Sequence, residues 1–147
     1  MSVINDDFFH LIQKNIANLH NVAMSGLVTP EYHLVQNRAV LIFSLEVVLE
    51  AHRNKYSSHY SPLVGRLTLE HLILHKYKWP LREIRALTLA DSIFTLHEEL
   101  AFESLPESAQ LVIKNFGAHR SIKSFPEINE DEWDPELYLT IQKQQNW

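Results

Sequence analysis

The chain has 147 residues, of which 46% are hydrophobic, and it contains no cysteine. This length suits one domain with a sizeable core, and the lack of cysteine excludes disulfide bonds, thiol catalysis and cysteine-ligated metal sites. No apolar run approaches the ~20 residues of a membrane span, and the amino end lacks the positive charge of a signal peptide. We therefore expect a cytoplasmic protein without membrane association.

The formal net charge of −5 is unevenly distributed along the chain. Residues 1–126 carry 12 acidic and 12 basic side chains, whereas residues 127–147 carry six acidic side chains and one lysine. Residues 52–85 carry seven bases and two acids, and residues 86–107 carry five acids and no base. Opposite charges attract across the surface, so we predict that the acidic tail docks weakly and reversibly on the basic segment. The alternatives are a solvated tail that only aids solubility and a tail whose apolar residues pack on the body.

The spacing of apolar residues indicates helices throughout. Only three glycines occur, and alternation of apolar and polar residues is nowhere sustained. Capping residues and prolines predict helix starts near Asn5, Pro30, Pro62, Pro80, Thr88, Pro106 and Pro135. The first helix is expected to end near Gly26, and a long helix over 30–54 is expected at the centre of the core. The helix after Pro62 is apolar around much of its circumference, which is typical of a buried helix.

These elements predict an all-α protein, a compact bundle of about five to seven helices with an acidic C-terminal extension. Residues 1–117 are expected to form the helical domain. Residues 118–147 are expected to form an acidic linker and a short C-terminal helix, packed on that domain or tethered to it.

Two arginine–histidine spacings are similar to those of HEPN ribonucleases, which act without metal on a helical bundle. Arg53 is followed by Asn54 and then, after further residues, by His59; Arg66 and His71 form a second pair. In such a site the histidine transfers a proton and the arginine stabilises phosphate charge. Chance accounts for spacings of this kind in a chain with six arginines, so Arg53 and His59 stay an alternative to a non-enzymatic protein.

His71 and His75 stand one helical turn apart, at the spacing that lets two imidazoles share a zinc ion. No third ligand lies at motif spacing, and the glutamate of zinc protease helices is missing. We therefore expect neither a metal site nor a cofactor, and keep these two histidines as the weak alternative.

The basic segment is interleaved with aromatic residues, a mixture found at protein interfaces and on stacking platforms. The residues that we expect to bind a partner are Arg66, Tyr77, Lys78, Trp79, Arg82 and Arg85. Residues 79–100 also suggest a helix-turn-helix, but residues 89–100 contain no base to contact DNA. A nucleic-acid-binding regulator that uses residues 52–85 is therefore the weaker alternative to a protein-binding function.

The run HYSPLVGRLTLEHLILHKYKWPLREIRALTLADSIFTLHEEL resembles a family of short proteins carried by enterobacterial phages and prophages. The features that carry the resemblance are GRL at Gly65–Leu67, WPL at Trp79–Leu81 and IRALTLADSIF followed by HEEL. They cover about residues 59–100, and the family supplies no catalytic residues to transfer. The resemblance implies a phage-borne accessory protein inside a bacterial host cell. We expect it to bind a host or phage protein, as a defence inhibitor or a regulator, with homodimer formation left open.

Overall fold

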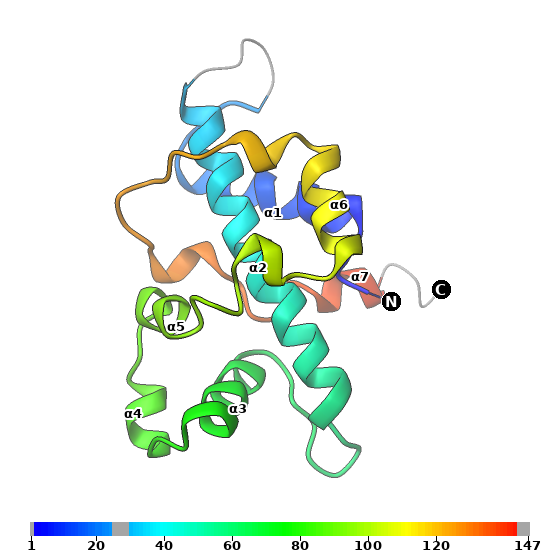
Figure 1. Cartoon of the computed structure of the whole chain (residues 1–147), viewed down its shortest axis with the longest axis vertical. Helices are drawn as coiled ribbons and strands as arrows, with labels where there is room; N and C mark the ends of the chain where they lie inside the picture. Colours follow the sequence, from blue (N-terminus) through cyan, green and yellow to red (C-terminus); the bar gives the residue numbers. More distant parts are fainter. Residues whose placement is uncertain (1, 25–29, 144–147) are drawn as a thin grey trace.

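The structure is a computed structural model that describes residues 2–24 and 30–143 (Figure 1). These residues form seven α-helices and three short 3₁₀-helices, and they contain no strand. The α-helices are α1 (Asp6–Leu19), α2 (Pro30–Tyr56), α3 (Arg66–Tyr77), α4 (Leu81–Arg85), α5 (Leu89–Thr95), α6 (Glu107–Asn115) and α7 (Leu139–Lys143). The 3₁₀-helices are η1 (Phe102–Ser104), η2 (Ala118–Arg120) and η3 (Glu130–Glu132). The predicted all-α bundle is confirmed.

α2 runs through the centre of the molecule, with α1 and α6 beside its first half and α3 beside its second half (Figure 1). Residues 42–47 are all buried, so this part of α2 is covered on every side. Each fully buried aliphatic or aromatic side chain contributes about 1.5 to 3 kcal/mol relative to an exposed one. The central position predicted for the long helix is confirmed, and Leu45 is among its buried residues.

Short-range hydrogen bonds explain where α1 and α5 begin. The Asn5 side chain accepts a hydrogen bond from Phe8 N at 2.7 Å, and Thr88 Oγ1 accepts one from Asp91 N at 3.0 Å. Each bond satisfies a backbone donor that has no partner within the first helical turn. Both capping residues were predictable because the whole motif lies within four residues.

α1 ends earlier than predicted, at Leu19 instead of near Gly26, which itself lies outside the described residues. Asn21 adopts a left-handed conformation with φ of 56°. Val22 N then donates to Ala17 O at 2.9 Å, which closes the helix in a Schellman motif. Glycine is the more common residue at this left-handed position after a helix. Because asparagine occupies it here, the sequence did not predict the end of α1.

α3 begins later than predicted, at Arg66 instead of Pro62. Gly65 has φ of 61° and breaks the chain direction just before the helix, and its N–H donates to Tyr138 Oη at 3.1 Å. The expectation of a largely buried helix is also wrong, because only Thr68, Leu69 and Ile73 are buried. One face of α3 therefore covers α2, while the other is open to solvent.

A corner at Trp79 and Pro80 joins α3 to α4, where the sequence predicts the start of a new helix. Lys78 is left-handed, with φ of 59°, and Pro80 precedes the first residue of α4. The Trp79 ring is half-buried against the core and stacks on Tyr77, with ring centres 4.9 Å apart.

The acidic C-terminal segment packs on the body through apolar side chains. Trp133 and Tyr138 are buried, and Leu137, Leu139 and Ile141 pack against the core. Tyr138 also lies under the Arg53 guanidinium, 3.7 Å from ring centre to Cζ. No ion pair joins residues 127–136 to residues 52–85 in the described part of the chain, so docking by charge alone does not describe this segment.

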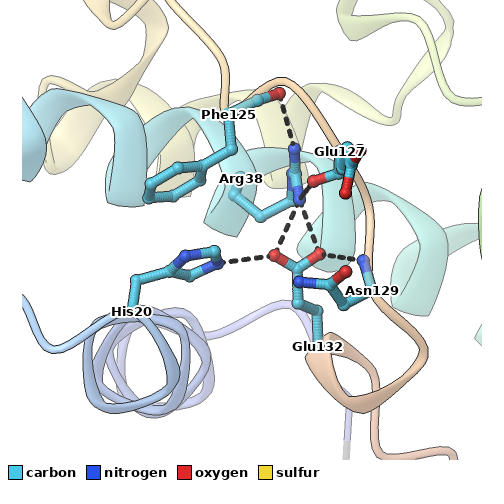
Figure 2. A network of polar contacts seen from close by, with 6 residues as sticks. All are labelled: His20, Arg38, Phe125, Glu127, Asn129 and Glu132. Atoms are coloured by element: carbon cyan, nitrogen blue, oxygen red, sulfur yellow. Dashed lines mark hydrogen bonds and ion pairs between the residues drawn. The ribbon is translucent and has the colours of Figure 1, made fainter.

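A buried ion pair between Arg38 and Glu132 fixes this segment to α2 (Figure 2). Arg38 Nη1 donates to both Glu132 carboxylate oxygens, at 2.7 and 2.5 Å, and to Glu127 O at 3.0 Å. Arg38 Nη2 donates to Phe125 O at 3.1 Å. The Arg38 side chain is 2% exposed and that of Glu132 is fully buried, so each charge depends on the other for the stabilisation that water would otherwise give.

His20 completes the network by contacting the same Glu132 carboxylate (Figure 2). Its Nε2 lies 2.7 Å from Glu132 Oε1, and its ring stacks on Phe125 with centres 3.8 Å apart. The Glu132 carboxylate also accepts a hydrogen bond from Asn129 N at 3.0 Å, within η3. One carboxylate thus connects the end of α1, the middle of α2 and the C-terminal segment.

Glu132→Ala should lower the free energy of unfolding by about 3 to 5 kcal/mol, because it leaves the Arg38 charge buried without a counterion. Chemical denaturation of the full chain measures the change. Glu127→Ala is the matched control, since the Glu127 side chain is exposed and should change stability by less than about 0.5 kcal/mol. Equal small effects for both variants would show that Arg38 does not depend on Glu132.

Candidate functional site

The basic and aromatic residues predicted to bind a partner lie on α3, on α4 and at the corner between them. Arg66 donates to Leu87 O at 2.9 Å and lies 3.7 Å from Glu70, and Arg85 lies 3.4 Å from the same carboxylate. These two arginines therefore meet at Glu70 and join α3 to α4.

The other four predicted residues surround the corner. Tyr77 donates to Thr95 O at 2.9 Å and stacks on Trp79. Lys78 and Arg82 are exposed. The described contacts of Tyr77 and Trp79 are thus largely internal, which leaves Lys78 and Arg82 as the predicted basic residues without an ion pair in the described part of the chain.

The structure does not bring Arg53 and His59 together. Arg53 lies in the last turn of α2 with its guanidinium over Tyr138, whereas His59 is exposed in the loop that follows α2. No hydrogen bond or ring contact joins the two within the described residues. The geometry therefore gives the ribonuclease alternative no support.

His71 and His75 belong to a cluster of four rings at the α2–α3 contact. His52 Nε2 lies 2.7 Å from His71 Nδ1, and Tyr56 Oη lies 3.0 Å from His75 Nε2. Sequence reasoning missed His52 and Tyr56, although they too stand four residues apart. The sequence signal for the cluster is that each of two neighbouring helices carries two ring side chains four residues apart. The described residues contain no group of three or more histidine, aspartate or glutamate side chains that could hold a metal ion.

His52 is the neutral member of this cluster near pH 7. Burial lowers the pKa of His52 to about 4, and the positive charges of His71, His75 and Lys55 act in the same direction. A neutral His52 can share a hydrogen bond with His71 without bringing a second charge into the contact. We therefore read the cluster as packing between α2 and α3.

Glu46 is a buried carboxyl group beside the C-terminal segment. It is 1% exposed, and its Oε1 accepts a hydrogen bond from Trp133 Nε1 at 2.9 Å. Its Oε2 has no hydrogen-bond partner in the described part of the chain, and Glu46 is among the residues that line a cavity of about 40 Å³. Burial raises the pKa of Glu46 to about 7, although the Trp133 hydrogen bond and the Arg53 charge oppose the shift.

Glu46→Gln should make the protein more stable at about pH 8 but change stability little at about pH 4.5. The carboxyl pKa is raised from 4.5 to about 7, so the folded chain holds the proton more tightly than the unfolded chain. This contribution is fully present below about pH 4.5 and is lost as the pH rises through 7, whereas glutamine stays neutral and still accepts from Trp133. The expected gain at pH 8 is about 1 to 3 kcal/mol, measured by denaturation over the pH range.

Glu103→Gln is the control for that measurement, because Glu103 is exposed on η1 and should show no such gain. A difference between Glu46→Gln and the wild type that is independent of pH would show that Glu46 does not titrate in this range.

An open groove of about 490 Å³ lies between α2 and the chain that follows α5, and we call it the Leu105 groove. It is lined by Val47, Val48, Ala51, Glu98, Glu99, Ser104, Leu105 and Pro106. The two walls come from distant parts of the sequence. α2 supplies the first three residues, and the chain on both sides of η1 supplies the others. Most of the lining is apolar, which is typical of surfaces that accept side chains from another molecule.

Two glutamates stand at the edge of this apolar surface. Glu98 is exposed, and Glu99 forms an ion pair with Lys76 of α3 through Oε1. Glu99 Oε2 is buried and has no hydrogen-bond partner in the described residues. Sequence reasoning identified the acidic stretch 86–107 but not the groove, because the α2 wall is supplied by residues about 50 positions away.

Comparisons with protein-family models, curated proteins and solved structures found no match. None of the described helices is long and apolar enough to cross a membrane.

Proposed function

We propose that this protein is a non-enzymatic, phage-associated accessory protein that binds a host or phage protein through the Leu105 groove. The observation that carries the proposal is the open apolar groove itself, with Val48, Ala51 and Pro106 available at its surface. Apolar surface that stays open in the free chain gains stabilisation when a partner covers it, at about 25 cal/mol per Å² removed from water. The phage context rests on the resemblance over residues 59–100.

The charges around the groove favour a protein partner over nucleic acid. A phosphate backbone needs lysine or arginine, whereas the groove carries Glu98 and Glu99. Among the predicted basic residues, Arg66 and Arg85 are occupied with Glu70. A partner protein that presents apolar side chains fits the groove without that electrostatic cost. Binding of this kind would allow the protein to inhibit a defence factor or to regulate a host protein.

Ala51→Trp should abolish capture of the partner, because the indole fills the groove without adding charge. The immobilised full chain is exposed to lysate of enterobacterial cells, and the retained proteins are identified by mass spectrometry. At least about a tenfold loss of the specific partner is expected relative to the wild type.

Ala86→Trp is the matched control, since Ala86 is an exposed alanine beside the α3–α4 surface. Capture that survives Ala51→Trp but not Ala86→Trp would place the binding surface on α3 and α4 and contradict the proposal. Denaturation curves for both variants show whether either change unfolds the chain.

A further inference from the structure

We infer that the Leu105 groove binds a cationic amphipathic segment of the partner protein, whose apolar face covers Val47, Val48 and Leu105 and whose lysine or arginine side chains reach Glu98 and Glu99. This inference rests on the proposed function and adds the chemistry of the occupant.

The floor of the groove is apolar and therefore favours an occupant with an apolar face. Val47 and Leu105 are nearly fully buried and form its base, while Val48 is half-buried and Ala51 is exposed. Small and branched side chains on one helix face leave room for larger apolar side chains of an occupant. A segment with apolar residues three and four positions apart would place them all on this side.

The edge of the groove is negatively charged and therefore favours an occupant with positive charge. Glu98 is exposed, and the buried Oε2 of Glu99 is an acceptor without a donor, although Oε1 already pairs with Lys76. A positively charged donor from an occupant can reach the exposed carboxylate of Glu98, and such a donor forms a stronger bond than a neutral one. Residues 86–107 carry no lysine or arginine that could supply such a donor from the same stretch.

A second hollow of about 460 Å³ adjoins the groove at Leu105 and extends it along α6. It is lined by Leu105, Glu107, Gln110, Leu111 and Lys114, and Leu111 is 57% exposed. The surface therefore continues beyond the groove, to a region where Lys114 balances Glu107. The unbalanced negative charge is that of Glu98, because Glu99 already pairs with Lys76, so the basic residues of the occupant should cluster at one of its ends.

A library of phage-displayed random 16-residue peptides tests this chemistry. Selection uses the immobilised wild-type chain, after depletion on Ala51→Trp removes peptides that bind outside the groove. We expect the surviving peptides to combine apolar residues at helical spacing with lysine or arginine near one end. The synthetic form of the most frequent peptide is then measured by fluorescence anisotropy.

Its dissociation constant should rise about fivefold to tenfold for the double variant Glu98→Gln and Glu99→Gln, and the loss should shrink as salt is raised. Glu103→Gln is the matched control, because Glu103 is an exposed acid of the same stretch that does not line the groove, and it should change binding less than about twofold.

Neutral or acidic peptides that need an open groove would overturn the inference and leave the proposed function intact. The inference is also overturned, with the proposed function intact, if Ala51→Trp abolishes capture from lysate but no selected peptide binds the wild type better than Ala51→Trp. Selected peptides that match this chain's own sequence would identify a second copy as the occupant and also overturn it. If Ala51→Trp leaves capture from lysate unchanged, the proposed function fails first.

Discussion

The buried guanidinium of Arg38 is the constraint on which the C-terminal half of the structure depends. Other elements cover α2 at this position, so the Nη1 and Nη2 donors of Arg38 find acceptors inside the protein, whereas Nε has no hydrogen-bond partner among the described residues. Those acceptors are two backbone carbonyls and the Glu132 carboxylate, all within residues 125–132 (Figure 2). A buried ion pair often stabilises a fold no better than an apolar pair, but its separation is costly. We therefore infer that this pair selects which segment covers α2 and in which register.

The position of the Leu105 groove follows from the same pair through one short path. Glu132 ends η3, and Glu130 at the start of η3 accepts a hydrogen bond from Leu89 N at 2.5 Å, in the first turn of α5. The chain after α5 then supplies Glu98 and Glu99, and the Lys76 ion pair ties Glu99 to α3. The wall of the groove that lies opposite α2 is thus held in place before any partner arrives. A preformed surface lowers the entropy that binding would otherwise lose, so modest apolar contact can suffice for a specific interaction.

The sequence predicts the features that lie within a few residues of one another, such as the Thr88 cap and the long central helix. It does not predict the burial of Glu132, because an acidic residue in an acidic stretch is normally solvated and its partner Arg38 is 94 residues away. The Leu105 groove is hidden for the same reason, since Val48 and Glu98 meet only after the chain has folded. The charge pattern of the sequence identifies both acidic stretches, 86–107 and 127–147. Which of their carboxylates are buried depends on contacts with distant residues.

Hydrogen–deuterium exchange of the full chain, read by mass spectrometry, tests most directly whether Arg38 holds the C-terminal segment in place. In the wild type, the amides of Asn129, Glu132, Leu137, Leu139 and Thr140 should exchange slowly, because each donates a hydrogen bond within this segment. In Arg38→Met, this segment and the first turn of α5 should lose protection, while α1 and the first half of α2 keep theirs. A segment that exchanges like an unfolded chain in the wild type, or that keeps its protection in Arg38→Met, would contradict the account.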